Sequence, residues 1–240
     1  MRAYVGFDDT DTRDSDYGTG KLVRRFENVL PEGCHLWGVI RQQLLVDDRI
    51  PYTSHNSSAC AIIDLPDPSL MSELISRAVD HIEQESTEGS DPGLCIARDN
   101  DPALSQLSSL GRLCTAKVIT QHEILQATNG TYLSGHGGTN DGIIGAVAAV
   151  GLTASGWCGR FIEFGKLREL PVMISVAELE RSGIKVVSLD RNTMVPDHDD
   201  MVNTKGWLRP RLWGSQPILP VNPTGEKLWE SLGEKRRKNK

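Results

Sequence analysis

The apolar residues along the chain follow two spacings, one typical of strands and one of amphipathic helices. Alternating or continuous apolar runs predict strands over residues 2–7, 36–46, 59–65, 93–97 and 184–189. Apolar residues three or four apart predict helices over residues 22–30, 69–85 and 103–113. Residues 143–150 are apolar on every side, which predicts a buried helix. Helices and strands alternate without a strict β-α-β order, so the pattern favours an α+β fold over a doubly wound sheet.

The composition of the chain changes near residues 155–160. We expect a larger α+β unit over residues 1–155 and a smaller α+β unit with a basic tail over residues 156–240, whose elements can interleave across the boundary. In the smaller unit, Ser175 to Glu178 form a capping box that predicts a helix, which Gly183 ends. Residues 191–224 contain prolines and few periodic apolar positions, so we expect them to be irregular.

Composition and charge narrow the class of protein. The 240 residues carry a net charge of −6, so the body of the chain has no broad basic surface for nucleic acid, and the Lys and Arg run at residues 235–240 is expected to be solvated. No apolar stretch reaches about 18 residues, so we expect no membrane span. The N-terminus resembles neither a signal peptide nor a transit peptide, which favours a cytoplasmic protein. The five cysteines are widely spaced without a CxxC pair, as is typical of small core residues.

Three carboxylates directly follow the first predicted strand. Asp8, Asp9 and Asp11 lie so close together that their charges repel unless a cation or hydrogen-bond donors offset them. Mg²⁺ takes one or two carboxylates and completes its shell with water and substrate phosphates. The segment therefore predicts a magnesium site, with an ordinary solvated acidic turn as the alternative.

A short glycine-containing segment comes next along the chain. Gly18, Thr19 and Gly20 precede Lys21 at the start of a predicted helix, where backbone N–H groups and a cation can bind phosphate. The spacing of a P-loop is absent. The alternative is a simple turn in which Thr19 hydrogen-bonds its own backbone.

The strongest local signal is the glycine-rich segment 135–142, directly before the predicted buried helix. Gly137 and Gly138 permit close approach to a ligand, and the helix N-terminus adds unpaired N–H groups. Thr139, Asn140 and Asp141 add polar side chains, and Asp141 can also be the helix N-cap. We expect nucleotide or phosphate binding here, with a tight structural turn as the alternative.

A polar loop between two predicted strands completes the candidate residues. Tyr52, Ser54, His55 and Asn56 bring hydroxyls, an imidazole and an amide together, which suits a hydrogen-bonding substrate loop. Clusters of Ser, Thr and Asn are also ordinary loop chemistry, and that alternative stays open.

Taken in order, these segments resemble the N-terminal part of archaeal agmatinylcytidine synthetase (TiaS), a family that modifies an isoleucine tRNA. That family opens with a strand and G-[IV]-D-D-T-D-S, and continues with G-x-C-T-T, I-P-[YW]-K-T-R-G-N, N-P-G and G-A-L-A-A-[IV]-G. The corresponding segments here are residues 6–12, 18–20, 50–58, 91–93 and 142–151. The resemblance covers most of residues 1–155 and continues more weakly to about residue 190.

The resemblance implies a kinase-like domain that binds ATP and Mg²⁺, packed with a ferredoxin-like domain. It implies that Asp8, Asp9 and Asp11 hold the metal and assist phosphoryl transfer, and that Thr19 is the residue that becomes phosphorylated. In the family, phosphorylation activates a cytidine carbonyl, and agmatine then displaces the phosphate. The glycine-rich segment 135–142 would lie against phosphate or the second substrate.

The sequence also departs from the family pattern. Thr53 and His55 stand where the family has Lys and Arg, and Gly20-Lys21 replaces the second Thr and its neighbour. The sequence ends at Lys240, whereas the family continues into an OB-fold and a zinc ribbon that grip tRNA. We therefore do not expect this chain to hold a whole tRNA without those parts.

The function we expect is ATP-dependent phosphoryl-transfer activation of a carbonyl or amide acceptor, with ligation of an amine as a further step, as in a truncated TiaS-like synthetase. One alternative is an RNA-modifying synthetase that acts with a partner chain. Another is a nucleotide- or metabolite-binding regulatory protein without turnover, which the missing Lys and Arg favour. The sequence names neither the acceptor nor an oligomeric state, and a homo-oligomer is compatible with it.

Overall fold

The computed structural model describes residues 1–53, 55–128, 130–192 and 194–233. The helices are α1 (Thr19–Arg25), α2 (Met71–Glu85), α3 (Leu104–Cys114), α4 (Gln121–Ala127), α5 (Gly142–Ala154) and α6 (Val176–Arg181), with short 3-10 helices at Phe26–Val29 and Pro68–Leu70. The strands are β1 (Arg2–Asp8), β2 (His35–Gln43), β3 (Ser57–Asp64), β4 (Gly93–Arg98), β5 (Tyr132–Gly135), β6 (Arg160–Glu163), β7 (Met173–Ser175), β8 (Lys185–Ser188), β9 (Met201–Asn203), β10 (Arg211–Trp213), β11 (Gln216–Gly225) and β12 (Leu228–Ser231). The predicted α+β class is confirmed.

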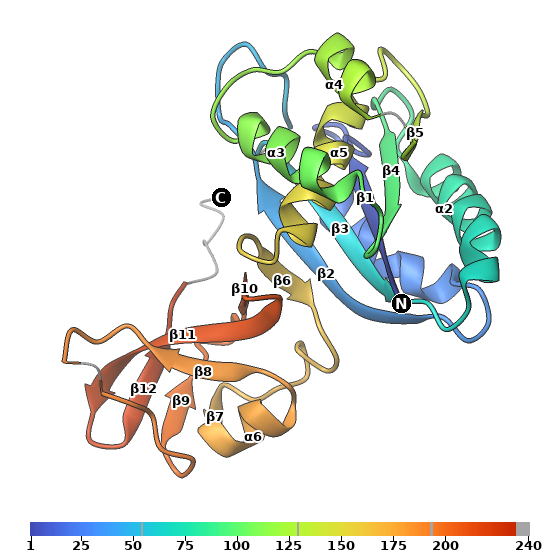
Figure 1. Cartoon of the computed structure of the whole chain (residues 1–240). Helices are drawn as coiled ribbons and strands as arrows, with labels where there is room; N and C mark the ends of the chain where they lie inside the picture. The colour runs from blue at the N-terminus through green and yellow to red at the C-terminus, as the bar shows by residue number, and fades with distance from the viewer. Residues whose placement is uncertain (54, 129, 193, 234–240) are drawn as a thin grey trace.

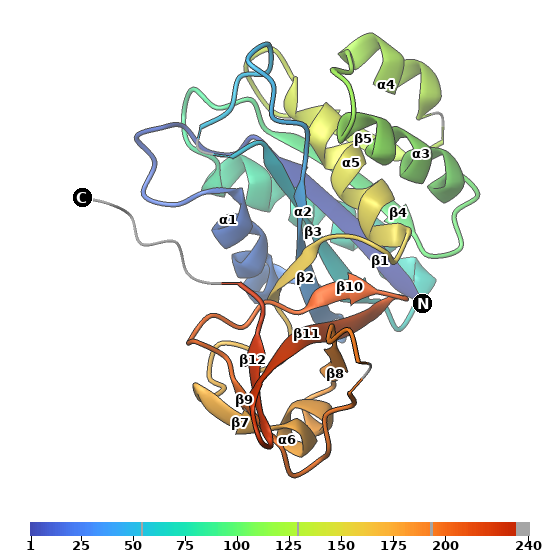
Figure 2. The same cartoon turned by 90° about the vertical axis from the view of Figure 1, so that its left-hand side faces the viewer.

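The strands form one continuous sheet in the order β5-β4-β1-β3-β2-β6-β10-β11-β12-β9-β7, with β8 paired to β11. Figures 1 and 2 show an upper lobe around β1 to β5 and a lower lobe around β7 to β12. Strand β6 pairs with β2 of the upper lobe on one side and with β10 on the other, so the sheet itself joins the lobes.

Helices cover both faces of the sheet in the upper lobe (Figure 1). Because side chains alternate along β1, Val5 and Phe7 point to one face, where they are fully buried with Leu22 of α1 and Ile82 of α2. Helices α3 and α5 pack on the opposite face, over a second core that includes Cys95 of β4. The sheet therefore separates two apolar layers, and β1 lies between them.

Helix α5 rests with its backbone directly on the sheet because glycines occupy the contact. A Cβ on Gly6 of β1 would overlap the carbonyl oxygen of Ala146, and a Cβ on Gly93 of β4 would overlap the backbone of Gly142. Every residue from Gly145 to Thr153 is buried, so the prediction of a buried helix is confirmed. This contact brings the N-terminus of α5 to the end of β1, where the acidic residues follow.

The expectation that residues 191–224 are irregular is wrong. The segment contains β9, β10 and most of β11, and β11 pairs with β8, β10 and β12. Ile218, Leu219 and Val221 are buried in the core of the lower lobe or at its edge. Their burial outweighs the prolines of β11, whose missing N–H groups cost ladder hydrogen bonds but leave the extended backbone intact.

The helix predicted over residues 22–30 starts earlier and ends earlier. Helix α1 begins at Thr19, since the carboxylate of Asp11 accepts a hydrogen bond from the Thr19 N–H at 3.0 Å and so caps the first turn. The backbone tightens into a 3-10 helix from Phe26 to Val29 before Pro31. The capping carboxylate lies eight residues before Thr19, outside the spacing of a local capping motif.

The sequence predicts neither helix α4 nor the strands β5, β6, β7 and β12. Helix α4 is short and buries Ile124, but it does carry a capping box, in which Thr120 and Glu123 each bond the other's backbone. Strand β5 is a short, partly exposed edge strand that pairs with β4. Its residues alternate too briefly for a strand signal.

The described cysteines are all free, and each is buried or half-buried, as the sequence predicts. Within the described residues, no helix is long and apolar enough to cross a membrane. The division of the chain at residues 155 and 156 stays a prediction. The basic run at residues 235–240 lies outside the described residues.

The glycine contact beneath α5 makes a direct stability prediction. Replacing Gly93 by Ala should lower the free energy of unfolding by about 3 kcal/mol, because the added methyl must displace the backbone of Gly142. Gly225 is the matched control, since its nearest neighbour would be Leu228 Cβ at 3.8 Å. Gly225→Ala should change the free energy by less than about 0.5 kcal/mol. Urea unfolding of both variants measures this, and equal losses would contradict the proposed contact.

Candidate active site

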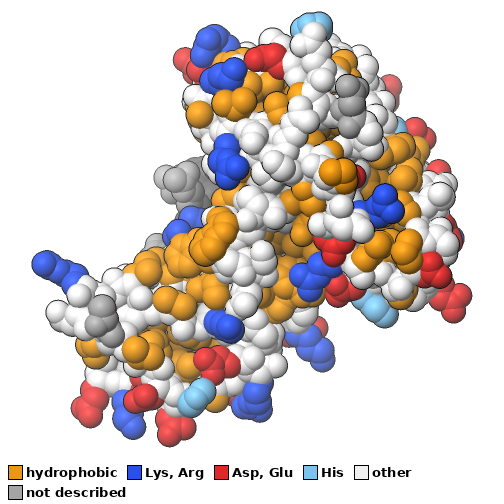
Figure 3. Space-filling model, viewed as in Figure 1, with side chains coloured by type: hydrophobic (Ala, Val, Ile, Leu, Met, Phe, Trp, Pro, Cys, Tyr) orange, Lys and Arg blue, Asp and Glu red, His pale blue; other side chains and the backbone are white. Residues whose placement is uncertain are grey.

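A cleft with a volume of about 2560 Å³ is lined by residues at the ends of β1 and β2 and by residues of β6 and β10. Figure 3 shows the hollow between the lobes and the hydrophobic side chains that gather around it. Of the predicted site residues, the following line this cleft: Asp8, Asp9, Asp11, Gly18, Thr19, Gly20, Tyr52, His55, Asn56 and Asp141. The tertiary structure thus collects three of the predicted segments, and Asp141 of the fourth, at one place.

The innermost acidic residue is Asp8, at the end of β1. Its carboxylate lies against Gly145 of α5, where any Cβ would overlap it. Burial raises the pKa of Asp8 to about 8, and the neighbouring charges of Asp9 and Asp11 contribute to the rise. The Asp8 carboxyl therefore keeps its proton near neutral pH unless a cation binds there and displaces the proton.

Asp9 lies beside Asp8 in the left-handed backbone region, with φ of 52°. Burial raises the pKa of Asp9 to about 6, followed by repulsion from Asp91, Asp11 and Asp141. Carboxylates from three separate segments therefore concentrate negative charge at one end of the cleft. We call this end, with Asp8, Asp9 and Asp11, the acidic mouth.

The third acidic residue, Asp11, is bound by hydroxyl groups. Its Oδ1 accepts hydrogen bonds from the backbone N–H of Thr19 at 3.0 Å and from the Thr19 hydroxyl at 3.1 Å. Its Oδ2 accepts a bond from the Thr53 hydroxyl at 3.1 Å. The Thr10 hydroxyl donates to Thr19 Oγ1 at 3.0 Å. The Thr19 side chain thus folds back onto the acidic segment, and this is its arrangement rather than a bond to its own backbone.

The carboxylates of the acidic mouth suit a hard cation that takes most of its ligands from water and from the phosphates of a substrate. In the part of the chain that the structure describes, no group of three or more His, Cys, Asp or Glu side chains is placed to hold a metal ion by itself. Yet Asp8 and Asp9 have raised pKa values because burial and neighbouring like charges disfavour their ionised forms, and a divalent cation would relieve this repulsion. Mg²⁺, which needs one or two carboxylates, fits these residues, whereas an all-protein cage does not.

The glycine-rich segment takes a different position from the one expected. Its Thr139 and Asn140 N–H groups donate to the carboxylate of Asp91, and so does the Thr139 hydroxyl at 2.7 Å. A Cβ on Gly138 would overlap this carboxylate. Gly137, Gly138, Thr139 and Asn140 do not line the main cleft, since the loop folds back onto Asp91. A carboxylate of the chain itself thus occupies the amides that were expected to face phosphate.

Two further expectations change in detail. Lys21 does not line the cleft, because its ammonium lies 4.8 Å from the centre of the Tyr17 ring. Asp141 stands at the N-cap position of α5 but makes no side-chain capping bond, and its carboxylate instead accepts a bond from Gln121 at 2.6 Å. Gly18 keeps its expected place, with its backbone against the carboxylate of Asp11.

The residues of the polar loop between β2 and β3 have two different roles. Asn56 is structural, because its amide donates to the carbonyl of Leu45 at 2.6 Å and its own backbone carbonyl accepts from the Leu44 N–H. Tyr52 and His55 line the cleft. Ser54 lies outside the described residues, so its predicted role stays a prediction.

The sequence alone does not indicate two groups of residues that shape the site. Asp91, which does not itself line the cleft, clamps residues 138–140 through a contact across 48 positions. Arginines and tryptophans on or beside β2, β6 and β10 form one wall of the cleft: Arg41, Trp157, Arg160, Arg211 and Trp213. They are scattered singly along the chain, so no local motif marks them.

No protein-family model matches the chain, and no curated protein matches it. Solved structures do. They include apo TiaS, a tRNA agmatidine synthetase, at a TM-score of 0.51 and 22% identity, and the complex of TiaS with an isoleucine tRNA and ATP, at 0.53 and 22%. The chain has a partial TiaS-like fold.

The TiaS-like region is a limited part of each protein. The likeness covers 63% of this chain, and the chain spans about a third of the length of the structures it matches, 35% of apo TiaS and 36% of the ATP complex. A structure described as a tRNA fluorescent labeling enzyme matches to the same extent, at a TM-score of 0.51 and 24% identity. At these identities the likeness shows the TiaS-like fold, and the kinase-like and ferredoxin-like detail stays a prediction.

The acidic mouth predicts a characteristic dependence of stability on pH. Asp8 keeps its proton in the folded chain up to about pH 8, but an unfolded Asp loses it near pH 4. The folded state therefore binds more protons between these values, so the free energy of unfolding should fall as the pH rises through this window.

The variant Asp8→Asn tests this assignment, because an amide does not titrate. Urea unfolding of both proteins without divalent metal should give a smaller loss of stability between about pH 4 and pH 8 for Asp8→Asn. Asp9 adds a weaker fall that should end near pH 6 in both proteins. Identical pH profiles would show that Asp8 is not held protonated.

Proposed function

We propose that the chain binds ATP with Mg²⁺ at the acidic mouth of the cleft and transfers a phosphoryl group to activate a carbonyl or amide acceptor. Where the reaction continues, an amine displaces the phosphate from the activated carbon. The TiaS-like fold supports this proposal, since TiaS has been solved as a complex with an isoleucine tRNA and ATP. The finer assignment rests on the residues of this chain.

The observation that carries the proposal is the pair formed by Asp11 and Thr19. The Thr19 hydroxyl is buried, lines the cleft and donates to the Asp11 carboxylate at 3.1 Å. A hydroxyl in contact with a carboxylate base is the arrangement of an activated nucleophile. The Thr10 hydroxyl, which donates to Thr19 Oγ1, orients it.

In the proposed step, Thr19 Oγ1 attacks the γ-phosphorus of ATP as its proton passes to Asp11. The bond from Oγ1 to phosphorus forms, the bond from phosphorus to the β,γ-bridging oxygen breaks, and ADP leaves with that electron pair. Mg²⁺ bound with the triphosphate would neutralise the charge that develops on the phosphate oxygens. The phosphoryl group can then pass from Thr19 to the acceptor oxygen.

One observation favours a second candidate, a nucleotide-binding regulatory protein without turnover. Thr53 stands where the TiaS pattern has a cation, and its hydroxyl binds Asp11 at 3.1 Å instead of offering a positive charge to phosphate. Fewer cations at the acidic mouth mean less stabilisation of a transferring phosphoryl group. An RNA-modifying synthetase that acts with a partner chain remains the third candidate.

Phosphopeptide mapping after incubation with Mg·ATP tests the transfer step. Phosphate should appear on Thr19, should persist on the serine of Thr19→Ser, and should be lost in Thr19→Ala. Asp11→Asn should slow its appearance by about 10²- to 10⁴-fold, the usual contribution of a general base. Thr224→Ala, which removes an exposed hydroxyl of β11, is the matched control and should leave the phosphorylation unchanged. An unmodified Thr19 in protein that binds ATP would favour the regulatory binder.

Calorimetry tests the metal. Without Mg²⁺, no cation offsets the repulsion between the triphosphate and the carboxylates of Asp9 and Asp11, and Asp8 binds a proton in place of the metal. ATP should therefore bind markedly more weakly in chelator, and its affinity should recover when Mg²⁺ is added. Because the metal competes with the protons on Asp8 and Asp9, the recovery should strengthen as the pH rises through about 6 to 8. Equal ATP affinity with and without the metal would contradict the magnesium site.

A further inference from the structure

Three arginines form a row across neighbouring strands in the same cleft as the acidic mouth. Arg41 of β2 is the register partner of Arg160 of β6, and Arg160 is the register partner of Arg211 of β10. Directly opposite residues point to the same face of a sheet, and all three side chains line the cleft. The row spans two strand spacings, about 10 Å.

The structure gives this row no carboxylate partner within the described residues. Arg41 donates to the Ser57 hydroxyl at 3.0 Å, while Arg160 and Arg211 make no ion pair with a described Asp or Glu. The pKa of Arg41 is lowered by burial and by the charge of Arg160, and the pKa of Arg211 is lowered by the same two causes. Like charges directly opposite one another destabilise a sheet, so the row has a cost in the free chain.

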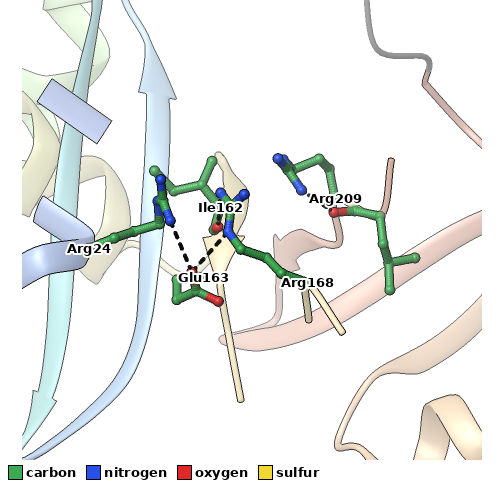
Figure 4. Close-up of polar contacts among 6 residues, drawn as sticks. Arg24, Ile162, Glu163, Arg168 and Arg209 are labelled. Atoms are coloured by element: carbon green, nitrogen blue, oxygen red, sulfur yellow. Dashed lines mark hydrogen bonds and ion pairs between the residues drawn. The ribbon is translucent and has the colours of Figure 1, made fainter. Parts of the chain in front are cut away.

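A nearby arginine group shows the contrast. Arg24 and Arg168 both bind the carboxylate of Glu163, at 3.5 and 3.0 Å (Figure 4), and the guanidinium of Arg209 lies 3.7 Å from the Trp207 ring centre. Glu163 offsets part of the charge at that end of β6. At the Arg160 end of the same strand, no described carboxylate does so.

Aromatic rings flank the row. The guanidinium of Arg211 lies 5.2 Å from the centre of the Trp213 ring. Trp157 is 70% exposed and lines the same cleft, and the turns that carry these two tryptophans are joined by a hydrogen bond from Ser215 N–H to the Gly156 carbonyl at 2.9 Å. A large exposed indole beside uncompensated arginines suits a ligand with both a flat ring and a phosphate.

We infer that the row Arg41-Arg160-Arg211, with Trp157 and Trp213, is a second ligand site that binds a small phosphate-bearing molecule with a planar ring, of the nucleoside monophosphate class. Planar guanidiniums bind phosphate oxygens in pairs, and the phosphate would relieve the repulsion along the row. Other cations line the cleft, but carboxylates already bind Arg49, Lys117 and Lys205. The short span of the row, which has no carboxylate partner among the described residues, therefore favours a small ligand over a polymer, which needs a basic track several nucleotides long. The site lies in the same cleft as the acidic mouth but uses other residues, and binding there does not depend on ATP turnover.

Calorimetry with uridine 5′-monophosphate and uridine tests the site. The monophosphate should bind, and uridine, which lacks the phosphate, should bind about tenfold to a hundredfold more weakly. Arg160→Ala should weaken monophosphate binding to a similar degree, and added salt should weaken it in the unmodified protein. Arg181→Ala removes an exposed arginine of α6 and is the matched control, with unchanged binding expected.

Thermal unfolding without ligand distinguishes a binding role of the arginine row from a structural one. Arg160→Ala should unfold at the same temperature as the unmodified chain or higher, because it removes a like charge from the row. A clear loss of stability would show that the row holds the sheet together and would overturn the inference.

Three further outcomes would overturn it. Uridine 5′-monophosphate that fails to bind, or binds no better than uridine, would remove the phosphate site. Displacement by a non-hydrolysable Mg·ATP analogue would show that the row is part of the ATP site. Binding of a short single-stranded oligonucleotide much tighter than that of the monophosphate, again lost in Arg160→Ala, would assign the wall to a nucleic-acid strand. If Thr19 is never phosphorylated but the monophosphate binds as expected, the proposed function fails and this site stands.

Discussion

The contact between the backbone of α5 and the strands β1 and β4 is the constraint on which the site depends. Gly6, Gly93 and Gly142 leave no side chain between helix and sheet, so the helix N-terminus reaches the end of β1. At that point the carboxylate of Asp8 fits over Gly145, where a side chain would displace it. A close-packed contact of this kind cannot be loosened gradually, since each added atom must move a backbone.

The cleft contains two groups of charged side chains of opposite sign. Acidic residues gather at the mouth, where burial and mutual repulsion raise the pKa of Asp8 and Asp9. Arginines gather on the wall formed by β2, β6 and β10, which line the same cleft. The two charge groups do not neutralise each other by ion pairs, among the described residues, so each retains the capacity to bind a ligand of its own kind.

The joint between the lobes keeps these groups in a fixed relation. Strand β6 pairs with β2 and β10, so the wall of the cleft is part of the sheet rather than a flexible connection. Phe161 of β6 is fully buried against Trp37 and Phe164, which stack edge to face around it. The arginine row crosses the joint itself, and so its geometry depends on both lobes.

The sequence by itself determined the α+β class, the buried helix and the acidic segment after β1, because each has a local signal. Apolar residues on every side of 143–150 predict burial, and three carboxylates in a short segment predict a charged turn. The tertiary structure decided which partners these segments meet. Asp11 caps α1, Asp91 occupies the amides of the glycine-rich loop, and Arg41, Arg160 and Arg211 become neighbours. Except for the bond from Thr19 to Asp11, which spans eight residues, these contacts join residues far apart in the chain. Strand register and packing, which have no local signature, place them together.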